Sequence, residues 1–100
     1  MSRKNLIDKM NEILRHEWTG IAQYAQASFV VMGLWREVFS KTFLDSADES
    51  FTHAKRIGEK ISAYGGVPTI ERNQVQQSED LEEMIRHALT FESKAVELYT

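Results

Sequence analysis

The scarcity of turn signals limits the possible folds of this sequence more than any other feature. Glycine and proline are rare, with five glycines and one proline in 100 residues. A β-rich chain of this length needs turns about every 8–12 residues. Gly65, Gly66 and Pro68 cluster instead in one polar segment, about 65–77, which predicts a single long loop. We therefore predict an all-α fold of long helices with one crossover loop.

Three segments repeat their apolar residues every three or four positions, which is typical of amphipathic helices. The first predicted helix covers about 2–34, with Ser2 as its N-cap, and the second covers about 38–64 and ends before Gly65. The third covers about 78–100, with Ser78 as its N-cap and an acidic first turn. It carries no helix-end signal, so we expect a chain truncated at its C-terminus. Residues 1–100 are thus expected to form one domain, an antiparallel bundle without its fourth helix.

Composition and charge exclude several classes of function. Twelve Lys and Arg against 15 Asp and Glu give a formal net charge of −3, which argues against a nucleic-acid partner. The longest apolar stretch, 29–35, is far shorter than the roughly 20 residues of a membrane span. Because the sequence has no cysteine and no targeting segment, we expect a cytoplasmic protein without disulfides or thiolate metal sites. The open flank of an incomplete bundle predicts a homo-oligomer, at least a dimer.

Position 17 holds a glutamate where the repeat of Met10, Ile13, Ile21 and Tyr24 predicts an apolar side chain. A carboxylate buried alone costs several kcal/mol, so Glu17 is expected to meet an arginine or a metal ion inside the bundle. A salt-bridged or partly exposed glutamate remains the alternative. Tyr24 lies two turns further along the same face, where its hydroxyl can reach the same site.

Two more polar residues fall near predicted apolar faces. Glu92 lies at the margin of the apolar face of the third helix, and His53 lies on the second helix. Taken alone, a helical histidine is more often a surface or packed residue than a metal ligand. Carboxylates from two helices and an imidazole from another are typical of carboxylate-bridged iron or manganese bundles.

The order of these motifs resembles that of a known family. They are Glu17, Gln23-Tyr24, His53-Ala54, Gly66-Val67-Pro68, and Leu81-Glu82-Glu83-Met84-Ile85-Arg86 leading to Glu92. Over essentially the whole chain, this order is similar to that of the bacterioferritins in the ferritin-like superfamily. The resemblance implies an antiparallel four-helix bundle that oxidises Fe(II) with dioxygen or peroxide and stores Fe(III) mineral in hollow shells.

The resemblance also implies a ligand set. The family holds two metals with a Glu on the first helix, a Glu-x-x-His on the second, a bridging Glu on the third and another Glu-x-x-His on the fourth. Glu17, His53 and Glu92 match, but Ser50 stands where the second-helix glutamate is expected and Glu49 precedes it. Glu49 points roughly 140° from the apolar stripe of its helix, so that only a π-bulge brings it inward. The candidate metal ligands are therefore Glu17, Glu49, His53 and Glu92.

The chain also departs from the family pattern. Phe51 stands two residues before His53, where the resemblance implies a haem-binding methionine, so we predict no haem. The missing fourth helix must come from a longer chain or a second chain.

The first hypothesis is iron binding and storage with ferroxidase-type oxidation of Fe(II), in which Tyr24 is the candidate catalytic residue. Iron is the expected metal, with manganese or zinc as alternatives. The second hypothesis is an assembly or interaction subunit with a degraded or incomplete metal site. The third is an unrelated helical module that docks on a partner helix.

Overall fold

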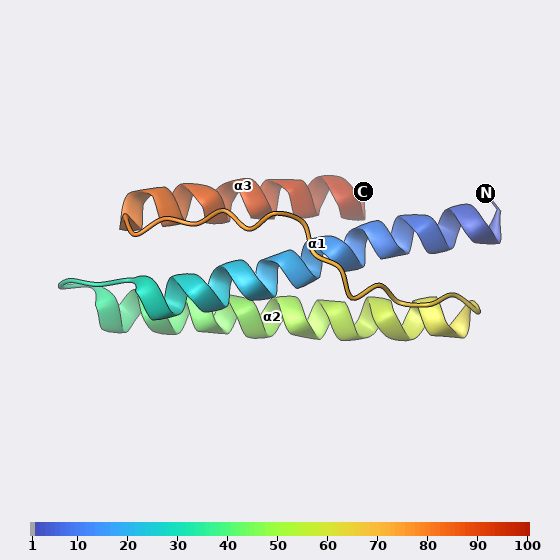
Figure 1. The fold of residues 1–100 in the computed structure, drawn as a ribbon, viewed down its shortest axis with the longest axis horizontal. Coiled ribbons are helices and arrows are strands. Elements are labelled where there is room, and N and C mark those ends of the chain that lie inside the picture. The colour runs from blue at the N-terminus through green and yellow to red at the C-terminus, as the bar shows by residue number, and fades with distance from the viewer. Residues whose placement is uncertain (1) are drawn as a thin grey trace.

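A computed structural model describes residues 2–100, which form three helices without strands. Helix α1 spans Arg3–Val30, α2 spans Arg36–Ala63 and α3 spans Leu81–Tyr99. Helices α1 and α2 form a long antiparallel hairpin, and α3 lies beside α1 and runs in the opposite direction to it (Figure 1). The molecule is a rod of 50 × 19 × 19 Å. The prediction of an all-α antiparallel bundle with one crossover loop is confirmed.

The first helix ends earlier than the predicted boundary near residue 34. It stops at Val30, and the chain reverses through 31–35, where Gly33 has a φ of 92° that L side chains rarely adopt. The Arg36 guanidinium donates to the carbonyls of Phe29 and Val31, which the end of the helix leaves without helical partners. At the other end, the Ser2 hydroxyl accepts from the Asn5 amide at 3.1 Å, as expected for an N-cap.

The other helix boundaries also differ from the predicted ones. Helix α2 begins at Arg36 instead of 38 and ends at Ala63, and α3 begins at Leu81 instead of 78 and ends at Tyr99. The N-cap of α3 is Asp80, whose carboxylate accepts from the Glu83 amide at 3.1 Å. Ser78, the predicted cap, accepts from the Asp80 amide and so belongs to the loop. The crossover therefore covers 64–80 instead of 65–77.

The crossover loop lies along α1 (Figure 1), and polar side chains of α1 hydrogen-bond to it. These side chains hydrogen-bond to main-chain atoms of the loop, so the loop needs no secondary structure of its own to satisfy its backbone. The pairs are Asn11 with the Val67 carbonyl and the Thr69 amide, Trp18 with the Thr69 carbonyl, Thr19 with the Asn73 amide, and Gln23 with the Gln76 amide. The loop is thereby guided from the end of α2 to the start of α3.

The apolar core has two parts that join different helices. One cluster, formed by Tyr24, Val31, Phe43, Ala47, Met84 and Phe91, draws on all three helices. The other cluster, formed by Met10, Leu14, Ala54 and Ile61, draws only on α1 and α2. In the described part of the chain, no Cα atom of α2 lies within 8 Å of one in α3. Helix α1 is thus the common neighbour of both, whereas α2 and α3 approach each other through side chains such as His53 and Tyr99, whose ring centroids lie 6.3 Å apart.

Gly20 permits the close approach of α3 to α1, and this predicts a substitution effect. A Cβ atom at position 20 would overlap Phe91 Cζ and lie 2.8 Å from Ser50 Oγ. We expect Gly20→Ala to lower the free energy of unfolding by about 1–3 kcal/mol, as overpacking does in cores. Urea denaturation measures the change. Gly58→Ala is the matched control, because a Cβ there meets open space and an alanine favours the helix by about 0.5–1 kcal/mol. Equal stability of the two variants would show that α3 does not press on Gly20.

Candidate metal centre

Glu17 lies inside the bundle, in agreement with its predicted burial. Its exposed fraction is 2%. Its Oε2 atom lies 3.0 Å from His53 Nδ1 on α2 and accepts a hydrogen bond of 2.6 Å from the Tyr99 hydroxyl on α3. One carboxylate oxygen thus has a partner on each of the other two helices, which offsets the cost of burying the charge.

His53 and Glu49 lie on a side of α2 that water reaches. The His53 side chain is 39% exposed, and its Nε2 atom lies 4.0 Å from Glu49 Oε1. Helix α2 continues through these residues as a regular α-helix without a π-bulge. Glu49 consequently stays at the margin, with a 73% exposed side chain, while Ser50 occupies the buried position. Glu49 approaches His53 from the outside of the bundle.

Glu92 is bound by a buried tyrosine. Its Oε1 atom accepts a hydrogen bond of 2.6 Å from the Tyr24 hydroxyl, which crosses from α1 to α3. The Tyr24 ring packs between Phe43 and Phe91, with ring centroids 6.3 and 5.6 Å away. Burial, and then the hydrogen bond to Glu92, raise the pKa of Tyr24 far above its usual value. The phenol therefore stays protonated at neutral pH and serves as a donor to the carboxylate.

A cavity of about 210 Å³ brings the four predicted metal ligands to one place. All three helices contribute to its wall. The lining residues are Glu17, Ser46, Glu49, Ser50, His53, Phe91, Glu92, Ala95, Val96 and Tyr99. Carboxylate and imidazole groups around one cavity are the donor types that iron and manganese prefer in helical bundles. The volume leaves room for ions and water.

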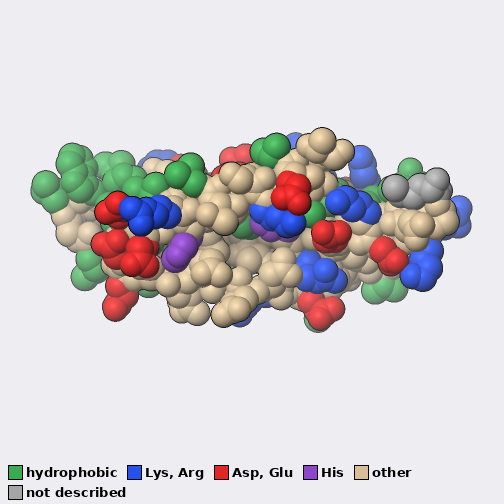
Figure 2. Space-filling view, turned by 90° about the horizontal axis from the view of Figure 1, so that it is seen from above, with side chains coloured by type: hydrophobic (Ala, Val, Ile, Leu, Met, Phe, Trp, Pro, Cys, Tyr) green, Lys and Arg blue, Asp and Glu red, His purple; other side chains and the backbone are tan. Residues whose placement is uncertain are grey.

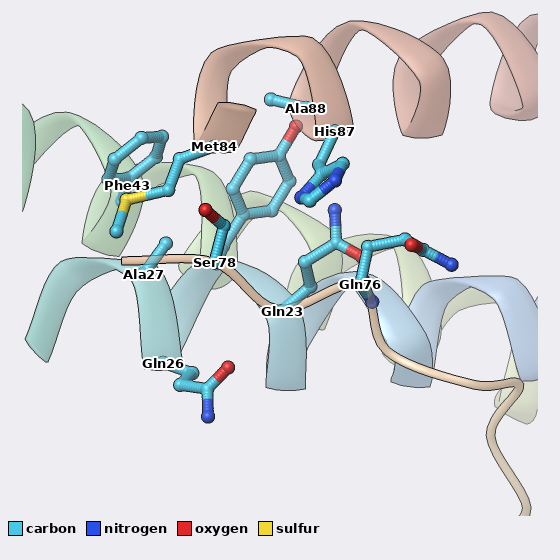
Figure 3. Close-up of a pocket in the computed structure, with 10 residues that line it drawn as sticks. Gln23, Gln26, Ala27, Phe43, Gln76, Ser78, Met84, His87 and Ala88 are labelled. Atoms are coloured by element: carbon cyan, nitrogen blue, oxygen red, sulfur yellow. Dashed lines mark hydrogen bonds between the residues drawn. The ribbon is translucent and has the colours of Figure 1, made fainter. Parts of the chain in front are cut away.

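A much smaller cavity of about 10 Å³ lies between α1, α3 and the crossover (Figure 3). Gln23 and His87 point toward each other across it, and Gln76 lines it from the crossover. This volume is near the minimum that admits one water molecule, and none of the four predicted metal ligands lines the cavity. It is therefore separate from the candidate metal centre.

The ligand set is incomplete within the described residues. In residues 2–100, no three or more His, Asp or Glu side chains are grouped closely enough to hold a metal ion. Glu17 pairs with His53, whereas Glu92 is bound by Tyr24 at another position on the wall of the cavity. The donor chemistry thus fits iron or manganese, but these side chains do not enclose an ion by themselves.

The comparison with protein families identifies the fold family. A family model described as a ferritin-like domain matches residues 7–100. This chain belongs to the ferritin-like domain family. The three helices and the crossover of this ferritin-like chain are thus those of an established fold, and the resemblance inferred from the motifs is confirmed.

Two solved structures resemble this ferritin-like chain closely. A ferritin-like diiron-carboxylate protein from Bacillus anthracis strain Ames is 34% identical, with a TM-score of 0.94, and the alignment covers 99% of this chain and 73% of that one. A dodecameric thioferritin, the bacterioferritin-related protein of Bacteroides fragilis, is 26% identical, with a TM-score of 0.89, and the alignment covers 99% of this chain and 65% of that one. The comparison with curated proteins gave no match. This ferritin-like chain therefore spans under two thirds of the Bacteroides protein.

Tyr99 is a residue of the centre that was not predicted from the sequence. Tyr24 was predicted near the site because it lies on the same helix face as Glu17, whereas Tyr99 was not among the predicted site residues. A signal was present, because Tyr99 follows Glu92 by the same interval at which Tyr24 follows Glu17. Two turns of helix bring such residues to one face. Burial and the hydrogen bond to Glu17 raise the pKa of Tyr99 above its usual value, so this hydroxyl is also protonated.

Proposed function

We propose that this ferritin-like chain binds Fe(II), oxidises it and passes it into storage as bacterioferritins do, with iron as its substrate. The observation that carries the proposal is the buried Glu17, which meets His53 across α1 and α2 at a cavity that Glu92 also lines. Further ligands would come from a helix outside residues 2–100 or from a second chain. The Bacillus relative is a diiron-carboxylate protein, which supports this assignment.

Each residue of the cavity has a chemical role under this proposal. Glu17 and His53 would be terminal ligands, Glu92 a bridging ligand and Glu49 an outer carboxylate that draws cations to the opening. A cation between His53 and Glu17 would be held by one imidazole nitrogen and one carboxylate oxygen. Two Fe(II) ions lose one electron each to dioxygen, and with two protons this gives two Fe(III) ions and hydrogen peroxide. Tyr24, hydrogen-bonded to Glu92, is the candidate catalytic residue.

The identity of the metal follows from the donors. Carboxylate and imidazole ligands favour iron or manganese, and zinc also accepts them. The sequence has no cysteine, so thiolate ligands that favour softer metals are absent. The absence of haem remains a prediction: Phe51 is 54% exposed and has no lone pair for iron.

We propose a homo-oligomer as the functional state, since the Bacteroides relative is dodecameric. Apolar side chains gather at the end of the rod that holds the turn between α1 and α2, at the left of Figure 2. This tip patch consists of Phe29, Met32, Leu34, Trp35 and Val38, each more than half exposed. Exposed apolar patches of this kind are typical of protein interfaces. None of the helices in residues 2–100 is long and apolar enough to span a membrane, and a cytoplasmic location stays a prediction.

An assembly subunit with an incomplete metal site is the second candidate. Ser50 fills the buried position on α2 where the resemblance implies a ligand glutamate, and Glu49 remains outside. Under this alternative, the same fold would contribute to a shell without oxidising iron. The two candidates make opposite predictions for iron oxidation.

Anaerobic Fe(II) titration of the purified oligomer, followed by air, distinguishes the two candidates. The iron proposal predicts about two Fe(II) ions per completed site and rapid formation of a diferric absorption band. Glu92→Gln should reduce both the number of bound Fe(II) ions and the rate at which the diferric band forms, because it removes the proposed bridging carboxylate. Glu97→Gln is the matched control, since Glu97 lies on the same helix, is exposed and, among residues 2–100, forms its ion pair with Lys94 alone. A folded wild-type oligomer that binds no iron would favour the assembly subunit.

A further inference from the structure

The two glutamate–tyrosine hydrogen bonds of the site form a reciprocal pair. Glu17 and Tyr24 lie seven positions apart on α1, and Glu92 and Tyr99 lie seven positions apart on α3. The two helices run antiparallel (Figure 1). As a result, each tyrosine reaches the glutamate of the other helix, and both hydrogen bonds measure 2.6 Å. A span of seven residues separates the two bonds by about 10 Å along the helices.

We propose that Tyr99 is a positioning residue of the iron site, which acts together with Tyr24 to fix the carboxylates of Glu17 and Glu92 before metal arrives. This inference rests on the proposed function. Tyr99 itself does not touch the ion under this proposal, but orients the carboxylate that does.

On each carboxylate only one of the two oxygens accepts a hydrogen bond within residues 2–100, and this supports the positioning role. Tyr99 and His53 both contact Oε2 of Glu17, whereas Oε1 makes no hydrogen bond within residues 2–100. On Glu92, Tyr24 occupies Oε1, and Oε2 makes no hydrogen bond in the same part of the chain. Each carboxylate therefore has one oxygen fixed by a phenol and one available for a cation. Outer hydrogen bonds of this kind orient metal ligands and commonly account for 10- to 100-fold in metal affinity.

The ring of Tyr99 packs against other groups independently of its hydroxyl. It lines the candidate metal cavity and, on its other side, a groove of about 660 Å³ that includes Arg56 and Lys60. The ring meets His53 edge-on, with centroids 6.3 Å apart. Tyr99→Phe keeps this ring and this wall and removes only the hydroxyl. The variant thus tests the hydrogen bond separately from the packing.

Binding of Co(II), as a spectroscopic stand-in for Fe(II), tests the positioning role in the assembled protein. We expect Tyr99→Phe to lower Co(II) affinity about 10-fold and to change the visible absorption of the bound ion, because Glu17 is no longer fixed. Tyr24→Phe should act similarly through Glu92. Tyr64→Phe is the matched control, since this third tyrosine lies at the end of α2 and lines neither cavity. Unchanged affinity and spectrum in Tyr99→Phe, with metal bound to the wild type, would overturn the inference and leave the proposed function standing.

A second measurement does not depend on metal. In the metal-free protein, Tyr99→Phe should raise the unfolding equilibrium constant about 5-fold, and by much less when Glu17→Leu has already removed the acceptor. Additive effects would show that the hydrogen bond is not formed, and would overturn the inference. A wild-type protein that binds neither Co(II) nor Fe(II) would overturn the proposed function together with the positioning role, even if the two residues are coupled.

Discussion

Glu17→Gln is expected to lower the Fe(II) affinity of the assembled protein by about 100-fold or more while the fold is retained. A glutamine has nearly the same shape as the glutamate and still accepts the Tyr99 hydrogen bond, but it carries no charge for the metal. Loss of an outer residue commonly costs 10- to 100-fold in affinity, and loss of a direct ligand costs at least as much. Anaerobic calorimetric titration with Fe(II) measures the change.

The stability of the same variant separates a metal ligand from a structural ion pair. The side chain of His53, the remaining partner, is 39% exposed and reaches water, so Glu17→Gln leaves no fully buried charge without a partner. We expect the free energy of unfolding in the presence of a chelator to stay within about 1 kcal/mol of the wild type, or to rise. Glu12→Gln, an exposed change on the same helix, is the control. Normal iron binding combined with a loss of several kcal/mol would instead identify Glu17 as half of a structural ion pair.

Phe91→Ala is expected to lower the free energy of unfolding by about 3–5 kcal/mol, the usual cost of removing a buried phenylalanine. Phe91 is the main side chain that α3 inserts toward α1. Its ring stacks on His16 with centroids 4.0 Å apart, meets Tyr24 edge-on and lies over Gly20. Helix α3 depends on this contact because, within residues 2–100, its backbone comes close only to that of α1 and not to that of α2. The substitution should therefore loosen the position of Glu92 as well as the core.

Urea denaturation, followed by circular dichroism, measures the effect of Phe91→Ala. Phe51→Ala is the matched control, since this phenylalanine is more than half exposed on α2 and its removal should cost under about 1 kcal/mol. Similar losses in the two variants would mean that α3 does not depend on the Phe91 contact. Iron oxidation that survives a large loss of stability would show that Glu92 is positioned by other means.

The helices were predictable from the sequence because each is encoded locally. The three-to-four spacing of apolar residues and the Gly65-Gly66 break require no knowledge of the neighbours. The residues at which the helices begin and end were less predictable. Val31 and Leu34 continue the apolar spacing beyond Val30, although Gly33 adopts a backbone conformation that ends the helix. Ser78 and Asp80 are both good N-caps, and only the register of α3 decides between them.

The candidate site was predictable only where a single helix defines it. Glu17 interrupts the apolar spacing of its own helix, and the marginal position of Glu49 follows from helix geometry alone. The contact of Tyr99 with Glu17 depends on how α1 and α3 are aligned, and no pattern within either helix fixes that alignment. The hydrogen bond from Tyr24 to Glu92 likewise depends on this alignment. The sequence therefore predicted that Tyr24 lies near the site, but not that Glu92 is its partner.

The way α1 binds the crossover has a consequence for which positions tolerate change. The side chains of Asn11, Thr19 and Gln23 recognise amide and carbonyl groups, which every residue except proline supplies in full. The loop can thus exchange most of its side chains and still follow the same route, whereas the three helix residues cannot be exchanged so freely. The path of the chain from α2 to α3 therefore depends more on the side chains of α1 than on the side chains of the loop.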